Sequence, residues 1–245
     1  MTPLLSVILP TYNREKFVKS AIESILGQSY IDFELIIIDD CSTDNTRQIV
    51  KSFNDTRVKY HRLDQNRGEY WCTNYAASIS SGKYLTWVHS DDLLAENSLK
   101  LRVEMLDKNS DIDFVHGDIE KIDEMGAKIL DLSASDLDKN SLLREYLIMP
   151  DARKVKYLIH HLSIMMRREF FQKTGGFDIS LPFAGDIDWL IRAIKIGNFK
   201  SIHEVLYYYR YHSQARRITD VKNGVNKDEV NMQIISKYKK LYGLD

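Results

Sequence analysis

Two pairs of adjacent aspartates, each at the end of an apolar run, are the residues of this sequence best suited to chemistry. Asp39 and Asp40 close one run, and Asp91 and Asp92 close the stretch 84–92, which reads Tyr-Leu-Thr-Trp-Val-His-Ser-Asp-Asp. An unpaired carboxylate is costly to bury, so these acids are expected to face a cation or solvent. Mg²⁺ and Mn²⁺ prefer such oxygen ligands. The alternative is that the acids only cap the helices that follow them.

The apolar runs before the acids are predicted to be strands of one sheet. Residues 4–9, 33–38, 58–61 and 84–88 are short and rich in β-branched or aromatic residues, and a helical pattern follows each run. This repetition indicates an α/β fold with a mostly parallel, Rossmann-like sheet and helices on both faces. Ligands bind beyond the carboxyl ends of such strands, so both acid pairs are expected at one cleft.

The remaining elements are predicted from the same periodicities. Asn13 is expected to cap the first helix and Gly27 to end it, while Asp186 or Asp188 opens a later helix. Residues 131–161 have no clear period, and we expect them to belong to a second-substrate region. Further strands are expected at 113–116, 164–166 and 205–211, a hairpin within 119–130, and a charged helix at the end of the chain.

Composition excludes several classes of protein. With 44% hydrophobic and 28% charged residues among 245, the chain has the composition of a globular protein, and we expect one domain. The net charge of −1 gives no reason to expect nucleic acid as a partner. Cys41 and Cys72 form neither a disulfide framework nor a zinc motif. Since neither a membrane span nor a signal peptide is recognised, we expect a cytoplasmic protein.

Tyr12 ends the first strand near both acid pairs, as in a nucleotide site where a ring stacks on the base; the alternative is a core aromatic. Further motifs run from residue 6 to about 212. They are 6–13 (Ser-Val-Ile-Leu-Pro-Thr-Tyr-Asn), 33–46, Asn66-Arg-Gly, 82–92, Gly175-Gly-Phe-Asp, Gly185-Asp-Ile-Asp-Trp and Tyr208-Tyr-Arg-Tyr-His. With these motifs the sequence resembles the family 2 glycosyltransferases of the GT-A fold.

The resemblance implies a nucleotide-diphosphate sugar as donor, with a UDP-sugar favoured. By position, it implies that Thr11 and Tyr12 frame the base and that Asp39 binds it. It also implies a nucleotide-sugar half at about 1–117 and an acceptor half with a C-terminal helix at about 118–245. The implied donor-binding residues are Pro10, Thr11, Tyr12, Asn13, Asp39, Asp40, Asn66, Arg67, Gly68 and Asp91.

The resemblance further implies a metal site and a catalytic base. Asp91, Asp92 and His212 would hold Mn²⁺ or Mg²⁺, and Asp186 would take the proton of the acceptor hydroxyl. A diphosphate leaving group needs charge neutralisation, so one displacement would invert the anomeric carbon. The alternatives are that Asp186 is a helix cap, with Asp188 beside it, and that His212 is an ordinary surface histidine.

Two positions depart from the family pattern. The family often has an acid at the position of His89 and a glutamate at the position of Gly185. A neutral imidazole brings no negative charge, so metal binding without donor is expected to be weak and coupled to the donor diphosphate. These departures leave open a non-catalytic nucleotide-sugar-binding subunit. A sugar nucleotidyltransferase, the other alternative, needs a Gly-rich loop with a lysine, which residues 10–15 lack.

The expected acceptor is a cell-surface polysaccharide or glycolipid, by resemblance alone. Basic residues near the C-terminus suggest peripheral association with the inner face of the membrane, because they would meet anionic lipid or pyrophosphate. They are Arg210, Arg216, Arg217, Lys222, Lys227, Lys237, Lys239 and Lys240.

Overall fold

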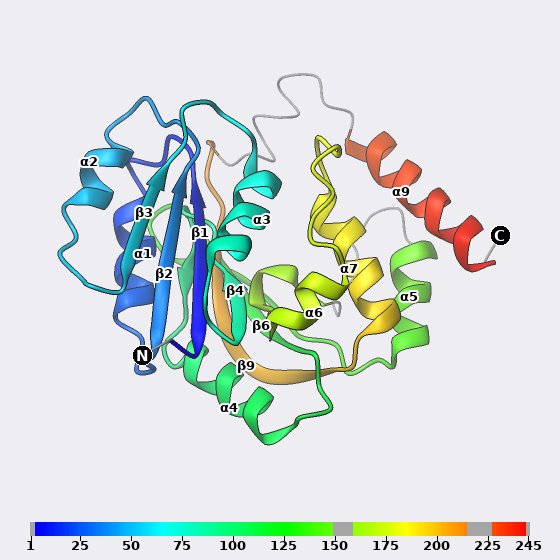
Figure 1. The fold of residues 1–245 in the computed structure, drawn as a ribbon. Coiled ribbons are helices and arrows are strands. Elements are labelled where there is room, and N and C mark those ends of the chain that lie inside the picture. The colour runs from blue at the N-terminus through cyan, green and yellow to red at the C-terminus, as the bar shows by residue number, and fades with distance from the viewer. Residues whose placement is uncertain (1–2, 149–158, 215–226, 244–245) are drawn as a thin grey trace.

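The computed structural model, which describes residues 3–148, 159–214 and 227–243, contains one curled sheet covered by helices on both faces (Figure 1). Its strands are β1 Leu5–Thr11, β2 Phe33–Asp39, β3 Val58–Arg62, β4 Tyr84–Trp87, β5 Leu93–Leu94, β6 Phe114–Ile122, β7 Lys128–Leu132, β8 Met165–Arg167 and β9 Phe199–Arg210. They pair in the order β3-β2-β1-β4-β8-β6-β9-β5, with β7 on β6.

The helices divide between two hydrophobic clusters, one on each face of the sheet. One cluster includes residues of α3 and α5–α7 together with α9, and the other includes residues of α1 and α4. The helices are α1 Val18–Leu26, α2 Thr46–Lys51, α3 Glu69–Ile79, α4 Ser98–Lys108, α5 Lys139–Ile148, α6 Arg168–Lys173, α7 Gly185–Ile196 and α9 Lys227–Tyr242.

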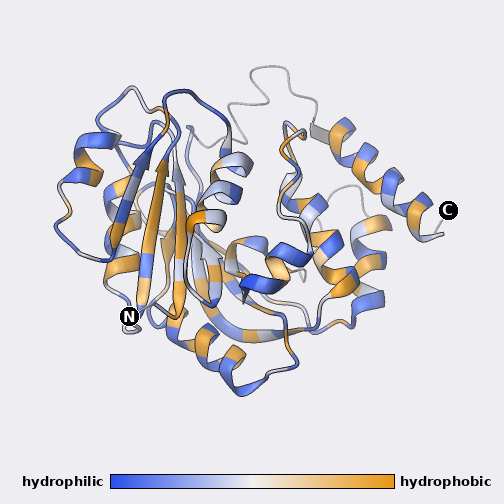
Figure 2. Cartoon of the chain, viewed as in Figure 1, coloured by the Kyte–Doolittle hydropathy of each residue, from blue (hydrophilic) through white to orange (hydrophobic). Residues whose placement is uncertain are grey.

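The first four strands in the sheet order are parallel, as the sequence predicts. β1 lies between β2 and β4, and β3 pairs with β2, all in the same direction. β1 and β2 are buried along their whole length, with Ile8 and Ile36 packing in one cluster and Val7 and Leu35 in the other. Figure 2 shows that these two strands are mostly apolar. Burial on both faces explains why they read as apolar runs without alternation.

The second half of the sheet is mixed. β8 is antiparallel to both β4 and β6, and β7 forms the predicted hairpin with β6. β9 runs parallel to β6, and near its carboxyl end it also pairs with β5, so that Tyr208 lies opposite Leu93. The register between β6 and β9 shifts next to Gly117, where an added Cβ would lie 2.4 Å from a side-chain carbon of Leu206. The path of β9 therefore brings its carboxyl end beside the residues that follow β4.

Three expectations need correction. Asn13 does not cap α1; it has φ = 50° and its Oδ1 accepts the Thr43 N–H at 2.8 Å, while the helix begins at Val18 and stops at Gly27 as predicted. β9 begins at Phe199, earlier than predicted, because it pairs with β6. Within 131–161, α5 forms where no period was recognised, because its buried residues pack against α7 and α9.

Candidate active site

Asp39 lies fully buried at the carboxyl end of β2, with donors of the protein on both oxygens. Its Oδ1 accepts the backbone N–H of Ser42 at 2.8 Å, and its Oδ2 accepts the Tyr60 hydroxyl at 2.6 Å. The guanidinium of Arg62 approaches Oδ2 at 4.0 Å. Burial, followed by the bond to Asp39, raises the pKa of Tyr60 above its usual value, so this hydroxyl remains a donor. Asp39 is thus held rigidly at the edge where a ligand would bind.

Asp40 closes the turn that precedes α3. Its two oxygens accept the backbone N–H groups of Arg67 and Gly68 at 2.7 and 2.8 Å, and the Asn66 side-chain amide donates to its carbonyl at 3.4 Å. Gly68 has φ = 87°, which residues with a Cβ rarely adopt. Asp40 therefore binds the same three residues, 66–68, that were predicted to act beside it, and it fixes the start of α3.

The end of β1 lies beside both aspartates. Pro10 is opposite Ile38 in the ladder, and the Thr11 carbonyl accepts the Asp40 N–H at 2.9 Å. The Thr11 hydroxyl is buried and has no hydrogen-bond partner among the described residues. Tyr12 is 43% exposed, so it is not a core aromatic. The structure brings these residues together at one edge of the sheet, as predicted.

Asp91 receives two basic side chains on one oxygen. Arg14 Nε and His212 Nε2 lie 3.0 and 3.1 Å from its Oδ2. Among the described residues, no hydrogen bond to its other oxygen, Oδ1, is found. The His212 side chain is 1% exposed, which excludes the alternative of a surface histidine.

Asp92 is 1% exposed and is held by β9. Its Oδ2 accepts the Tyr207 hydroxyl at 2.9 Å, and its Oδ1 accepts the Arg210 N–H at 2.7 Å. The guanidinium of Arg210 is also turned inward, because Nε donates to the Asp91 carbonyl at 3.0 Å. Arg210 was expected on a basic surface; it is buried instead and supports the acidic site.

The pKa values of the two adjacent carboxyls are shifted in opposite directions. Burial, followed by the negative charge of Asp91, raises the pKa of Asp92 to about 8. Burial works in the same direction on Asp91, but the hydrogen bond from His212 and the charge of Arg14 keep the pKa of Asp91 below its usual range. Asp91 is therefore the member of the pair that keeps its negative charge to the lower pH.

His89 lies between two carboxylates. Its Nε2 is 2.8 Å from Glu69 Oε1, and its Nδ1 is 3.7 Å from Asp92 Oδ2. Burial works to lower its pKa, but the charge and hydrogen bond of Glu69 raise the pKa of His89 to about 10. Ligand atoms of His89, Asp91 and Asp92 all lie within 4.8 Å of one another. Two carboxylates and a neutral imidazole suit a dication such as Mn²⁺, and binding the ion would displace the protons that His89 and Asp92 hold without it.

Asp186 lies in the first turn of α7 and contacts residues from two other elements. His161 Nδ1 lies 3.3 Å from its Oδ2, and the Tyr70 hydroxyl donates to its Oδ1 at 3.4 Å. The ring of His161 is 6.0 Å from that of His89, centroid to centroid. Asp186 is thus connected to Asp92 through a pair of histidines.

Asp188, the alternative base, is occupied by structural contacts. It is 1% exposed; Arg192 donates to its Oδ2 at 2.8 Å, and Lys237 and the Tyr238 hydroxyl donate to its Oδ1 at 3.1 and 2.7 Å. These bonds join α7 to α9. Of the two acids in this turn, Asp186 is therefore the one placed toward the site.

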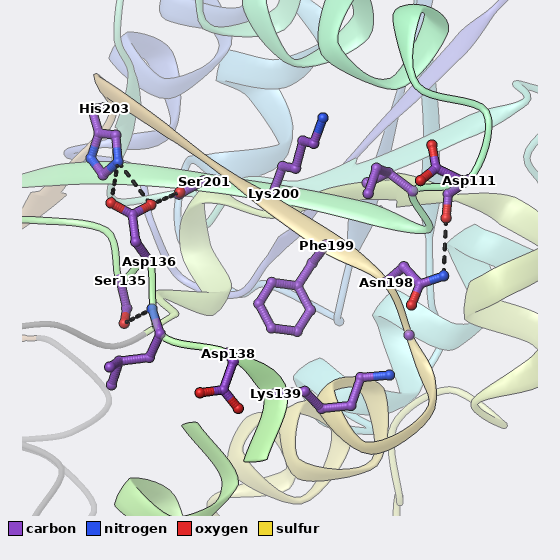
Figure 3. A pocket seen from close by; sticks show the side chains of 13 residues that line it. Asp111, Ser135, Asp136, Asp138, Lys139, Asn198, Phe199, Lys200, Ser201 and His203 are labelled. Atoms are coloured by element: carbon purple, nitrogen blue, oxygen red, sulfur yellow. Dashed lines mark hydrogen bonds and ion pairs between the residues drawn. The ribbon is translucent and has the colours of Figure 1, made fainter. Parts of the chain in front are cut away.

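An open cavity of about 750 Å³ lies at a different place, around the start of β9 (Figure 3). Its polar side chains bond mainly to the protein: Asp136 contacts His203 at 2.9 Å and also Ser201, and Asp138 accepts the Asn140 N–H that opens α5. None of the predicted site residues lines this cavity. We therefore place the chemistry at the aspartate edge.

Sequence reasoning missed five residues that contact the predicted ones: Arg14, Glu69, Tyr70, His161 and Tyr207. Arg14 and Glu69 directly follow predicted donor-binding segments, so their position was a usable signal. His161 lies in the stretch without a clear period, and Tyr207 was assigned only to a strand. For those two, no local pattern indicates the contact.

The basic C-terminal region is only partly described. Arg216, Arg217 and Lys222 lie outside the described residues. Lys237 is paired with Asp188. In the parts of the chain that the structure covers, every helix is too short or too polar to be a candidate membrane span.

Comparison with known proteins supplies the family. The chain matches the family described as Glycosyl transferase family 2 over residues 6–175. An uncharacterized glycosyltransferase of Rickettsia conorii is 30% identical over 215 residues, which are 86% of this chain and 34% of that protein. The UDP-Glc:alpha-D-GlcNAc-diphosphoundecaprenol beta-1,3-glucosyltransferase WfgD of Escherichia coli is 37% identical over 119 residues, 49% of this chain and 47% of WfgD. The chain spans 30–65% of the length of the five Rickettsia relatives it matches.

Solved structures share the architecture. S. aureus TarS in complex with UDP-GlcNAc superposes with a TM-score of 0.70 at 21% identity, covering 97% of this chain and 71% of that chain. The mannosyltransferase PcManGT of Pyrobaculum calidifontis, in complex with GDP-Man and Mn²⁺, gives 0.63 at 18% identity, covering 91% and 61%. These likenesses establish the GT-A fold. Since the family match covers most of the chain and begins on β1, the protein belongs to glycosyl transferase family 2.

Proposed function

We propose that the protein is an inverting, divalent-cation-dependent glycosyltransferase that moves a sugar from a nucleotide-diphosphate donor to a hydroxyl of a saccharide acceptor. The observation that carries this proposal is the continuous run of contacts from Asp92 through His89 and His161 to Asp186. It supports one site with an acidic cation-binding end and a separate carboxylate for proton transfer. This arrangement matches the two needs of the reaction.

At the donor end, Tyr12 is free to stack on the base, while Asp39 and the turn 66–68 line the same edge. Asp91, Asp92 and His89 would hold Mn²⁺ or Mg²⁺, and His212 supports Asp91. The cation would neutralise charge that develops on the departing diphosphate. Arg14, on the same carboxylate as His212, adds a fixed positive charge there.

At the acceptor end, Asp186 takes the proton of the attacking hydroxyl. The oxygen of that hydroxyl bonds to the anomeric carbon as the bond to the diphosphate breaks, so the single displacement inverts the configuration. His161 and Tyr70 contact the two oxygens of Asp186 and limit its rotation. No carboxylic acid is needed on the leaving group, because a diphosphate departs as an anion.

A UDP-hexose or UDP-N-acetylhexosamine is the proposed donor class, supported by the TarS complex and by the name of WfgD. The WfgD name likewise supports a lipid-linked saccharide of the cell envelope as acceptor. Residues 1–117 would bind the donor and residues 118–245 the acceptor, at the cytoplasmic side of the membrane. Sedimentation with anionic vesicles at low and high salt tests the membrane contact; absence of binding at both removes it.

A screen of purified protein against nucleotide sugars with Mn²⁺, measuring release of free nucleotide, tests the activity. We expect release from at least one UDP-sugar, and Asp186→Asn should lower turnover by about 10²-fold or more with donor affinity nearly unchanged. Donor binding without any hydrolysis or transfer would instead favour a non-catalytic subunit. If Asp186→Asn transfers within a few-fold of the parent, the base lies elsewhere.

A further inference from the structure

We propose that Tyr70 is a positioning residue for Asp186: its hydroxyl orients the carboxylate toward the acceptor, and Gly185 is required because the Tyr70 ring occupies the space of a side chain there. This inference rests on the proposed role of Asp186 as base. It assigns a function to α3, a helix that the donor-binding motifs only border.

The direction of the Tyr70 hydrogen bond follows from its neighbours. The backbone N–H of Gly185 donates to the Tyr70 hydroxyl oxygen at 3.0 Å, so that oxygen is used as an acceptor. A phenol has a single proton to give, and the Asp186 Oδ1 lies 3.4 Å away. Since a carboxylate oxygen accepts, the Tyr70 hydroxyl is the donor in this contact. This bond is long, and catalytic hydrogen bonds of this kind tighten when substrate is present.

The Tyr70 ring is fixed from two sides. On one side it stacks on Phe177 with centroids 5.5 Å apart. Asn74, one turn further along α3, holds the backbone of Phe177 with hydrogen bonds of 2.8 and 2.9 Å. On the other side, a Cβ added to Gly185 would lie 2.7 Å from a ring carbon of Tyr70, closer than real contacts allow. A side chain at position 185 and this ring position exclude each other.

The two oxygens of Asp186 thus have separate partners, Tyr70 on Oδ1 and His161 on Oδ2. With both contacts the carboxylate plane is set; with one removed, it can rotate about the remaining contact. Small losses of orientation at a reacting group are costly in turnover and leave ground-state binding of a distant ligand unaffected.

The same helix turn also reaches the donor end. Glu69, next to Tyr70, pairs with His89, and the preceding turn is held by Asp40. Consecutive residues of α3 therefore contact the cation-binding cluster and the base. The two departures from the family pattern, His89 and Gly185, each face one of these residues.

Tyr70→Phe tests the proposal, because it removes the hydroxyl and keeps the ring. With the nucleotide sugar that reacts in the screen, we expect kcat to fall about 10-fold while UDP affinity in Mn²⁺ changes less than twofold. Tyr75→Phe is the matched control: it removes a hydroxyl from the same helix at a residue that packs on Trp71 and His61, and it should leave kcat unchanged. Gly185→Ala should lower kcat as Tyr70→Phe does, by displacing the ring.

A double-mutant cycle separates positioning from a general effect on the fold. In an Asp186→Asn background, Tyr70→Phe should cause no further loss, since the group it orients is gone. If Tyr70→Phe lowers kcat by the same factor in that background, or if the single Tyr70→Phe variant keeps the parental kcat, the inference is overturned while the proposed base stands. A fully active Asp186→Asn variant overturns the proposed role of Asp186 as base, on which this inference rests, and absence of any transfer by the parent overturns the proposed function.

Discussion

Asp39-Asp40 and Asp91-Asp92 are the same dipeptide at the same edge of one sheet, yet different groups surround the two pairs. The first pair accepts hydrogen bonds from three backbone N–H groups and one hydroxyl. In the second pair Asp92 also accepts one backbone N–H and one hydroxyl, but ionisable side chains, Arg14, His89 and His212, surround the pair. The first pair is consequently part of the scaffold of the site, and the second carries its adjustable charge.

The end of a strand places each acid at this edge of the sheet, whereas the groups that contact the acid decide what it can do. Backbone N–H donors cannot lose their protons or leave, so they hold a carboxylate permanently. A histidine or arginine side chain can instead move away from the carboxylate. The carboxylate is then able to bind a cation, and the basic side chain a phosphate. Mutating one member of each pair should therefore produce opposite phenotypes.

Asp91→Asn is expected to have the largest effect on activity. Because the pKa of Asp91 is held below its usual range, this acid brings negative charge to the proposed cation site. Its loss should lower turnover by about 10²-fold or more, as several kcal/mol of charge stabilisation depend on the cation. The unfolding temperature should stay close to that of the parent. Nucleotide release and thermal unfolding measure the two quantities; an active but unstable variant would reverse the assignment of roles.

Asp40→Asn should mainly destabilise the fold. An amide offers one acceptor oxygen where two N–H groups now donate, so we expect a loss of about 2 to 3 kcal/mol. For a protein of this size the unfolding temperature should fall by roughly 4 to 12 °C. Calorimetry checks the value. An unchanged transition would mean that the turn 66–68 is held without this carboxylate.

The second pair should also make stability depend on pH. The pKa of Asp92 is raised to about 8 and that of His89 to about 10. At Asp92 the folded state therefore binds more protons than the unfolded state between about pH 4 and 8. At His89 it does so between about pH 6.5 and 10. Both groups therefore lower the free energy of unfolding as pH rises. We expect the unfolding temperature without metal to fall by a few degrees from pH 6 to 9, and His89→Gln to flatten that slope. A temperature that rises over this range would contradict the proton balance.

The smallest effect concerns metal binding in the empty site. His89→Asp adds a negative charge beside Asp91 and Asp92 and should strengthen Mn²⁺ binding several-fold. In the parent, Mn²⁺ should bind more tightly with UDP than without it, since the diphosphate supplies further ligands. Calorimetric titrations with and without UDP measure both. Equal Mn²⁺ affinity in all of them would place His89 outside the reach of the cation.

Local pattern was enough to predict most of the elements and the acids at their ends. Buried strands such as β1 and β2 read as apolar runs, and the stop of α1 at Gly27 and the β6–β7 hairpin follow from short-range rules. Where the local signal was weak the prediction failed, as for α5, which is stabilised by packing against other helices. Helices of that length depend on tertiary contacts more than on propensity.

The sequence by itself determined that Asp39 and Asp91 each follow the carboxyl end of a strand, and hence that they lie at one edge of the sheet, because residues of a strand and its loop are neighbours in the chain. Only the tertiary structure decided which acid does what. Arg14 and Asp91, which are in contact, are 77 positions apart in the sequence, and Tyr70 and Asp186 are 116 apart. No periodicity in the sequence indicates contacts over such separations. Asp186 and Asp188 lie in the same turn of α7, yet one faces His161 and the other is buried against Lys237 and Tyr238. Each residue of a helix is rotated by about 100° from the one before it, so side chains two positions apart point to opposite sides of the helix.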